Sequence, residues 1–423
     1  MEHSEEDTSS EISPAVVEIL KKFLDAKYGH QKYNYQIKGA AKKGDNYMGV
    51  VYRVTIKTHN DNANKQSVIL KVPPSNLLQR NQFFARAGFL REALAYEKFL
   101  PLVEDFQKSK GLDVSDRFFE YPQCYFTSTE EFDETICMND LQVEGFFMHN
   151  RFEPLTLDHV VYIMGIYAKL HATSLAMKDQ IPEKINSFKN ISDIFEQRKN
   201  DVQLNDYFES LKRSALESID KEHEQAYWDK LNEYFNSGTF YELMLTLLDS
   251  NTSEPYSVIC HGDCWINNVM FKQENGKVVD ARLIDWQIMR YSSPIIDIMY
   301  FLMSSTTREF RKQHFQQVLH GYHCAVQEHI KKLDSDPEKL YSCSAFNREF
   351  KKKGAIGLLF GMIVLPILTT KSEDVPDLEK LSEKVSAGHS TDAMEAGFVG
   401  AKSILFNERL RGIIMDSIDW NLI

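Results

Sequence analysis

The chain has 423 residues, enough for two or three ordinary domains or one large two-lobed enzyme, and its hydrophobic content of 43% can supply real cores. Acidic residues outnumber basic ones by 61 to 49, and the net charge of -12 argues against nucleic acid, which needs a concentrated basic face. The acidic N-terminus lacks the order of a secretory signal, and the six cysteines show no paired spacing. We therefore expect a cytoplasmic protein with reduced thiols.

The first third of the chain is predicted to be rich in strands. A helix at residues 14–24 comes first, because its apolar residues recur at helical spacing. Segments of β-rich composition follow at residues 35–40, 50–56, 67–72, 123–128 and 135–138. Turn chemistry between the first two of these segments predicts a hairpin, and two prolines end the third.

One helix is predicted inside this strand-rich region, over residues 81–100. We expect its apolar side to consist of Phe84, Leu90, Leu94 and Phe99. The residues expected to stay on its polar side are Arg91, Glu92 and Glu97.

The rest of the chain has mainly helical patterns. The long helical stretches are residues 157–178, 191–249 and 306–333, whereas residues 256–285 contain short apolar runs around polar motifs. The predicted fold class is therefore α+β with two lobes. A small antiparallel β-lobe with one helix would span residues 1–139, and a larger, mainly helical lobe would span residues 140–423.

The apolar run at residues 354–368 could be a membrane span or a core helix. It is shorter than the roughly 20 residues that a spanning helix needs. It also contains three glycines and Pro366, and Lys353 and Lys371 bracket it closely. We predict a buried core helix and no membrane contact.

Reactive side chains are densest at His261-Gly262-Asp263, with Asn268 nearby and Asp285 after the next apolar strand. Phosphoryl transfer needs a carboxylate to orient the acceptor hydroxyl and take its proton, and oxygen ligands to hold Mg²⁺ on the phosphates. Asp263 suits the first role, and Asn268 and Asp285 suit the second. A short loop between two strands can direct these side chains into one cleft.

The strand-rich lobe supplies a matching positive charge in Lys71, on a predicted strand, with Glu92 on the following helix as its partner. Such an ion pair would hold the ammonium group toward the α- and β-phosphates of a nucleotide. The turn at residues 44–49 would cover that nucleotide with backbone N–H groups, and no Walker A string occurs in the chain. Each feature alone is weak, but their order along one sequence strongly indicates a kinase.

In these motifs the chain resembles the CHK kinase-like or ecdysteroid kinase-like proteins, a group with a protein-kinase-like fold related to choline kinases and aminoglycoside phosphotransferases. The strings that carry the resemblance are Gly44-Asp45-Asn46-Tyr47, Leu70-Lys71-Val72-Pro73-Pro74, residues 89–101 with Glu92, Leu170-His171-Ala172, residues 261–268 and Leu283-Ile284-Asp285-Trp286-Gln287. The resemblance covers residues 14–410. It implies ATP as donor and a small hydroxylated acceptor, with ecdysteroids, other steroids and xenobiotics as the class.

The resemblance also implies roles for further residues. His261 would shape the catalytic loop, and Asp297 would anchor it, although an ordinary helix-start carboxylate explains Asp297 equally well. Gly44, Asp45 and Asn46 would contact the phosphates. Adenine would lie against a segment that contains Met138 and Asp140, where the string Met138-Asn139-Asp140-Leu141 departs from the family's usual acidic residue followed by Asp-Leu.

Other interpretations remain. Cysteine and histidine are typical zinc ligands, so Cys260, His261 and Cys264 could indicate a zinc site. No second pair of cysteines or histidines occurs at matching spacing. A peptide substrate is disfavoured, because the loop reads His-Gly-Asp and no Ala-Pro-Glu segment is evident. The main alternative is a catalytically silent protein of the same fold that binds a nucleotide or a steroid-like ligand. No obligate protein partner is evident.

Overall fold

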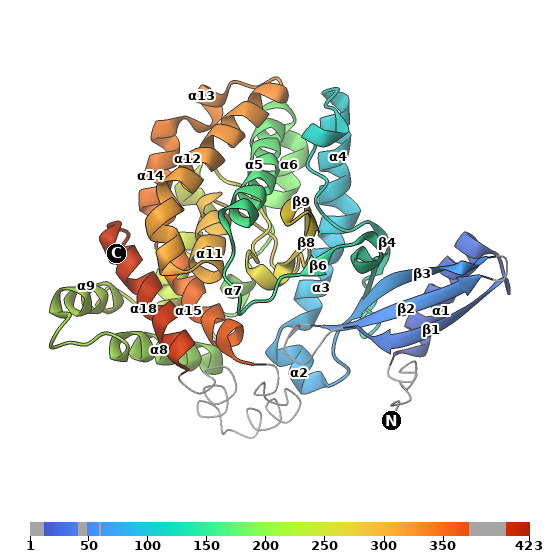
Figure 1. Cartoon of the computed structure of the whole chain (residues 1–423), viewed down its shortest axis with the longest axis horizontal. Helices are drawn as coiled ribbons and strands as arrows, with labels where there is room; N and C mark the ends of the chain where they lie inside the picture. The colour runs from blue at the N-terminus through green and yellow to red at the C-terminus, as the bar shows by residue number, and fades with distance from the viewer. Residues whose placement is uncertain (1–11, 41–48, 59–60, 372–402) are drawn as a thin grey trace.

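The computed structural model describes residues 12–40, 49–58, 61–371 and 403–423. A strand-rich part with an N-terminal helix projects at one end of the long axis, and helices form the bulk of the molecule (Figure 1). The predicted two-lobed α+β class is thus confirmed.

The strand-rich part is built on a five-stranded antiparallel sheet in the order β1-β2-β3-β5-β4. Its strands are β1 (Tyr33–Gly39), β2 (Val50–Thr58), β3 (Asp61–Val72), β4 (Cys124–Ser128) and β5 (Thr135–Asn139). Helix α1 (Pro14–Tyr28) buries Val16, Leu20 and Leu24, four residues apart, against alternate side chains of the strands. This core excludes the helices that follow β3.

The segment predicted as one helix over residues 81–100 is broken. It begins within α2 (Leu77–Gln82), contains α3 (Ala85–Leu94) and a π-helical turn (Ala95–Phe99), and ends at the first residue of α4 (Leu100–Ser109). Phe84 separates α2 from α3 with a left-handed φ of 54°. Pro101 follows the π-helical turn, and since proline lacks an N–H, regular hydrogen bonding is interrupted there.

The prediction of which residues form the buried side of that helix was also wrong in part. Leu90 is 38% exposed, whereas Arg91 and Glu92 are buried. The pattern misled because both charged side chains have polar partners, described below, and a charge with a partner can lie inside.

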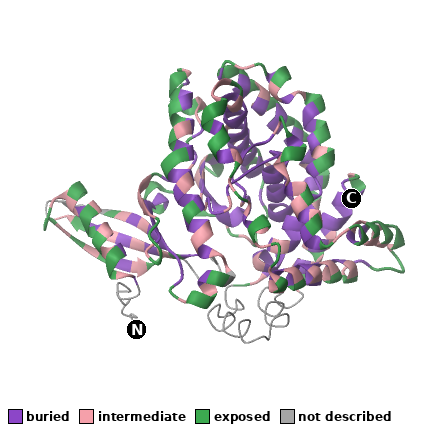
Figure 2. Cartoon of the chain, turned by 180° about the vertical axis from the view of Figure 1, so that it is seen from behind, coloured by how far each residue is buried: buried purple, intermediate pink, exposed green. Residues whose placement is uncertain are grey.

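The large lobe has two central helices, α5 (Leu157–Gln180) and α11 (Ile295–Ser305), and most of their residues are buried. The other α-helices in the described part of this lobe are α6 (Pro182–Lys189), α7 (Ile194–Gln197), α8 (Val202–Glu217), α9 (Gln225–Asn236), α10 (Phe240–Leu248), α12 (Arg308–Lys332), α13 (Pro337–Tyr341), α14 (Cys343–Lys353), α15 (Ile356–Thr369) and α18 (Ile404–Asp419). Figure 2 shows buried residues concentrated on the inward sides of these helices. One continuous core joins them to α3 and α4.

Two small sheets lie within the large lobe. One pairs β7 (Val258–Cys260) with β10 (Arg290–Ser292), and the other orders β6 (Phe147–Met148), β8 (Val269–Glu274) and β9 (Lys277–Leu283) as β6-β8-β9. The loops between these strands carry the polar motifs. The predicted boundary between residues 139 and 140 stays a prediction.

The apolar run at residues 354–368 forms most of α15, which is buried against α11. A Cβ at Gly357 would lie 2.9 Å from the carbonyl oxygen of Met299, so glycine is what permits this close approach. Among the described residues, α5 is long and apolar enough to cross a membrane, and the bent pair of residues 337–353 and 356–369 would also qualify if counted as one span. Most residues of α5 and α15 are buried in the core, whereas many residues of the 337–353 segment are exposed.

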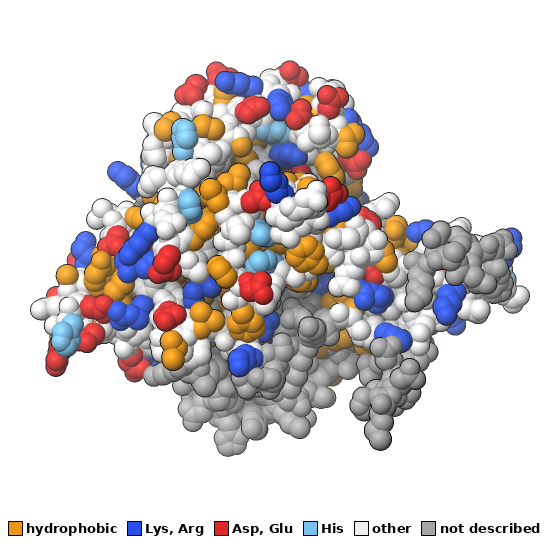
Figure 3. Space-filling model, in the orientation of Figure 1, with side chains coloured by type: hydrophobic (Ala, Val, Ile, Leu, Met, Phe, Trp, Pro, Cys, Tyr) orange, Lys and Arg blue, Asp and Glu red, His pale blue; other side chains and the backbone are white. Residues whose placement is uncertain are grey.

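Acidic and basic side chains are interspersed over the face seen in Figure 3. The expectation that the protein has no nucleic-acid partner stays a prediction.

Candidate active site

The loop after β7 has a shape that only glycine permits at its second position. Gly262 has a φ of +88°, and a Cβ there would lie 2.0 Å from the carbonyl oxygen of Ile288. No other residue fits without moving the backbone. The loop then passes through Asp263 and a 3-10 turn at Ile266–Asn268 into β8.

Asp297, in the first turn of α11, fixes the backbone of this loop. Its Oδ2 accepts a hydrogen bond from the His261 N–H at 2.8 Å, and its Oδ1 accepts one from the Gly262 N–H at 3.0 Å. His171 Nε2 lies 3.1 Å from Oδ2. Burial acts to raise the pKa of Asp297, but the hydrogen bond and charge of His171 outweigh it and leave that pKa below its ordinary value. The contacts therefore favour the anchoring interpretation of Asp297 over that of an ordinary helix-start carboxylate.

His261 is the first residue of the loop, and its side chain contacts the segment that follows β9. Its Nε2 is 3.1 Å from the carbonyl oxygen of Ile284, and its ring packs edge-on against Trp286 at 4.7 Å. Burial lowers the pKa of His261, so the neutral ring can hold the strand end beside Asp285.

The carboxylate of Asp263 is held at both oxygens. Asn268 Nδ2 donates to Oδ2 at 2.7 Å, and the Tyr300 hydroxyl donates to Oδ1 at 3.1 Å. Burial, and then the charge of Asp285, raises the pKa of Asp263 to about 7, despite these two hydrogen bonds.

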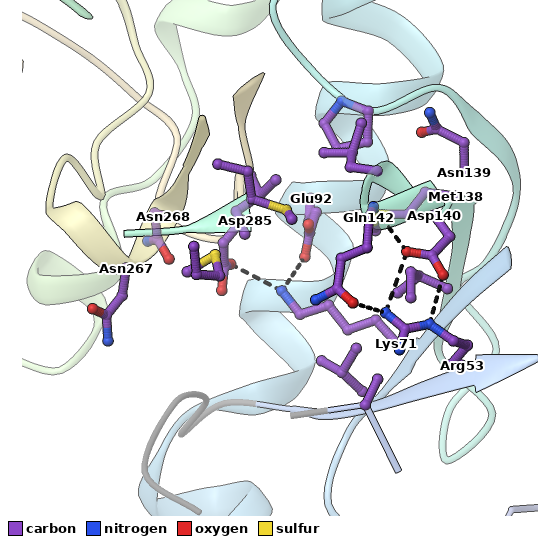
Figure 4. A pocket seen from close by; sticks show the side chains of 18 residues that line it. Arg53, Lys71, Glu92, Met138, Asn139, Asp140, Gln142, Asn267, Asn268 and Asp285 are labelled. Atoms are coloured by element: carbon purple, nitrogen blue, oxygen red, sulfur yellow. Dashed lines mark hydrogen bonds and ion pairs between the residues drawn. The ribbon is translucent and has the colours of Figure 1, made fainter. Parts of the chain in front are cut away.

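Lys71 joins the two lobes opposite this loop (Figure 4). Its Nζ lies 2.8 Å from Glu92 Oε2 on α3 and 3.0 Å from Asp285 Oδ1, which follows β9. Asp285 has a left-handed φ of 68°, which turns the chain at this point. Burial disfavours the charged lysine, but the carboxylates of Asp285 and Glu92 more than compensate and raise the pKa of Lys71. The buried Glu92 is therefore explained by its cation.

A cleft opens between the two lobes beside Lys71 (Figure 4). Apolar walls come from both lobes, and their residues are Val51, Ile69, Met138, Leu141, Met148, Met270 and Ile284. The polar side chains of Lys71, Asn268 and Asp285 line the same cleft. Apolar walls with a few convergent polar groups are typical of a small-molecule site.

Six of the predicted site residues line this cleft, namely Lys71, Glu92, Met138, Asp140, Asn268 and Asp285. Asp263 and His261 do not line the cleft, although the Asp263 carboxylate accepts a hydrogen bond from Asn268, which does. Asp140 lines the cleft, but its carboxylate bonds within the protein, to Arg53 Nε at 2.6 Å and to the Ser67 hydroxyl at 2.6 Å. Gly44, Asp45 and Asn46 lie outside the described residues. Tyr300 was not predicted, because nothing in its local sequence distinguishes it from the other apolar positions of α11.

The cysteine, histidine and aspartate side chains near the loop that could bind zinc bond to other protein groups instead. His171, Cys260 and Asp297 form the one cluster with metal-binding spacing among the described residues. Cys260 Sγ lies 3.4 Å from the carbonyl oxygen of Ser293, and Asp297 holds the loop as described. Cys264 is buried, and burial raises its pKa well above the ordinary value, which disfavours a thiolate ligand.

The family is established by sequence. A profile of the ecdysteroid kinase-like family matches residues 43–335. The chain belongs to the ecdysteroid kinase-like family. The match includes every residue that lines the cleft except Ala40.

The solved structures that match the chain include aminoglycoside phosphotransferases. The GDP complex of a mutant aminoglycoside 2′-phosphotransferase-IIIa is 11% identical, with 95% of this chain and 99% of that chain covered and a TM-score of 0.42. The GDP and kanamycin complex of a 2″-phosphotransferase is 10% identical, with 92% and 98% covered and a TM-score of 0.41. A 3″-phosphotransferase from Streptomyces rimosus is 11% identical, with 75% and 96% covered and a TM-score of 0.28. No curated protein matches the chain.

Proposed function

We propose that this member of the ecdysteroid kinase-like family transfers the γ-phosphate of ATP to a hydroxyl group of a small molecule. The observation that carries the proposal is the position of Lys71 Nζ between Glu92 and Asp285, at a cleft that Asn268 also lines. A lysine held by two carboxylates beside a catalytic-type loop is the arrangement that phosphoryl transfer needs.

The nucleotide would bind with its base between the apolar walls of the cleft and its phosphates toward Lys71. Asn268 donates through Nδ2, so its Oδ1 can face a cation together with the carboxylate of Asp285. Amide and carboxylate oxygens suit Mg²⁺, which would neutralise charge on the β- and γ-phosphates. The site residues therefore fit the ion.

Asp263 would act as the base. It would accept a hydrogen bond from the acceptor hydroxyl and take its proton as the new O–P bond forms and the bond to the β-phosphate oxygen breaks, releasing ADP. A pKa of about 7 is close to that of an ideal base at neutral pH. His261 and Asp297 would keep the loop in place and would not move protons.

The acceptor class follows from the family and not from the cleft. We propose an ecdysteroid, another steroid or a xenobiotic, phosphorylated in the cytoplasm as part of detoxification, with no obligate protein partner. Family membership alone does not specify a substrate, so this part requires a direct test.

The test is an acceptor screen with labelled ATP, with products read by mass spectrometry. Wild type should consume ATP only with Mg²⁺ and an acceptor, and Asp263→Ala and Asp285→Asn should each lower kcat by orders of magnitude while the fold stays intact. Wild-type turnover in either variant would refute the assigned roles. Tight ligand binding by titration without ATP consumption would instead support the silent binding protein.

A further inference from the structure

The carboxylate of Asp263 has a second holder outside its own loop. Asn268 reaches Oδ2 from within the loop, whereas Tyr300 reaches Oδ1 from α11, 37 residues further along the chain. The mechanism described above does not use Tyr300.

We propose that Tyr300 is a positioning residue, whose hydroxyl fixes the rotation of the Asp263 carboxylate so that it meets the acceptor hydroxyl. This inference rests on the proposed function and assigns a residue that sets its rate. A carboxylate turns easily about its terminal torsion, because that torsion has broad minima. One hydrogen bond to Oδ2 leaves this rotation partly free, and a second to Oδ1 removes it. Each oxygen still has a lone pair for the acceptor.

Helix α11 fixes the base in two ways at once. Asp297 and Tyr300 are three residues apart, so they lie on the same face of the helix. Asp297 holds the loop backbone at His261 and Gly262, and Tyr300 holds the side chain of Asp263. A shift of α11 would therefore move the loop and the carboxylate together.

Tyr300 is itself held rigidly. Its ring centroid lies 4.8 Å from that of Phe360 on α15, and its carbonyl oxygen accepts a hydrogen bond from the Ser304 hydroxyl at 2.7 Å. The side chain is 4% exposed. Burial, and then the charge of Asp263, raises the pKa of Tyr300 well above its ordinary value, so the hydroxyl remains a donor throughout the working pH range.

A buried hydroxyl that is merely satisfied by the nearest acceptor would affect stability alone. Tyr300→Phe separates the two roles, because it removes the hydroxyl and keeps the ring against Phe360. If Tyr300 positions Asp263, Tyr300→Phe should lower kcat roughly 10- to 100-fold, because the reacting carboxylate loses its alignment. The KM for ATP should stay unchanged.

The deciding measurement is a double-mutant cycle. In the Asp263→Ala background, Tyr300→Phe should cause no further loss of rate, since no carboxylate remains to be positioned. Tyr241→Phe is the matched control. Its hydroxyl donates to the carbonyl oxygen of Phe195 at 2.9 Å, it is 3% exposed, and its loss should leave kcat near wild type.

Each outcome bears on the inference. Wild-type kcat in Tyr300→Phe, or an equal loss in the Asp263→Ala background, would overturn it and leave the kinase function standing. A wild type that transfers no phosphate to any acceptor would refute both. If Tyr300→Phe does not fold, Phe360→Leu tests the same point, because loosening the ring should lower kcat by a smaller factor with the KM for ATP unchanged.

Discussion

Asp263 carries a charge that favours the reaction and disfavours the fold. Burial raises its native pKa to about 7, from a usual value of 3.8. Between these two values the native state binds more protons than the unfolded state, so this group makes stability fall as pH rises. At pH 8 its native carboxylate is ionised and costly.

Replacing that charge should therefore stabilise the protein. We expect Asp263→Asn, without nucleotide or Mg²⁺, to raise the free energy of unfolding at pH 8 by on the order of 1 kcal/mol. At pH 5 the wild-type carboxyl is mostly protonated, so the difference should shrink. Denaturant unfolding at both pH values measures this, and an equal or opposite difference at pH 8 would contradict it.

Asp297 is the opposite case, because its negative charge is stabilised by hydrogen bonds from the loop backbone and by His171. Its lowered native pKa means that it stabilises the fold above its unfolded pKa near 4 and that this contribution is lost as pH falls through the native value. Asp297→Ala leaves two buried loop N–H groups and His171 Nε2 without this acceptor. The expected cost is about 3–5 kcal/mol at pH 7, decreasing toward pH 3, by the same unfolding measurement. A constant cost across this range would show that the charge is not responsible.

Site residues within motifs could be proposed from the sequence, whereas residues that act through tertiary contact could not. Asp263 and Asn268 share one loop, and Lys71 lies on a strand with clear β-composition, so the order of these motifs along the sequence indicated them. Tyr300 contacts Asp263 only because β7 and α11 are brought together by packing. No local pattern encodes such a contact.

At the scale of elements, the segment before α7 connects α3 to β10. Arg91 on α3 donates to the carbonyl oxygen of Ser192, and Arg290 Nε on β10 lies 3.4 Å from Asp193 Oδ2. Both arginines are buried, and burial lowers the pKa of Arg91 to about 10, although Asp193 opposes this. Asp193 therefore offsets the charge of two inward-facing guanidinium groups.

Removing that carboxylate should destabilise the contact between these elements. Asp193→Ala is expected to cost about 3–5 kcal/mol, because buried positive charge is left without its counter-ion. Asp201→Ala is the control. Both aspartates cap a helix, α7 or α8, but Asp201 pairs with Arg198 near the surface, so its loss should cost about 1 kcal/mol. Equal costs in denaturant unfolding would contradict the special role of Asp193.

These contacts also explain why the helix over residues 81–100 was mispredicted. Periodicity assumes that charged side chains face water, and here Arg91 and Glu92 both point inward to partners on other elements. The break at Phe84 depends on a left-handed backbone angle that nothing in the local composition requires. By contrast, β1 to β3 follow alternation and proline placement and were predicted as strands, although β3 begins six residues before its predicted start at residue 67.

At the scale of the molecule, two large hydrophobic cores accompany a small cluster, whose Leu141 and Met270 line the cleft. One lies between α1 and the five-stranded sheet, and the other runs through the helical lobe with α3 and α4. The two-lobed organisation was predictable because strand and helix patterns occupy different parts of the sequence. The assignment of α3 and α4 to the larger core was not, since it depends on which surface their apolar faces meet.

A ligand that contacts both lobes should stabilise the whole molecule. Val51 and Ile69 line the cleft from the sheet, and Met270 and Asp285 line it from the helical lobe. Binding at a hundredfold excess over Kd adds about 2.7 kcal/mol to the free energy of unfolding. We expect Mg²⁺ with ATP to give this stabilisation, and ATP alone to give less, because Asp285 then faces the phosphates without a cation.

Lys71→Met should largely abolish the stabilisation by Mg²⁺ and ATP, since the phosphates lose their cation from the sheet. The quantity to compare is the gain in stability on adding ligand. The variant also leaves Glu92 and Asp285 without a shared partner, so its stability without ligand changes as well. Lys57→Met on β2 is the control, as Lys57 is exposed and should leave the gain unchanged. Thermal unfolding with and without ligand gives the result. If Lys71→Met is stabilised by ligand as much as wild type is, the nucleotide does not contact this lysine. The position of Lys71 would then no longer support the kinase proposal.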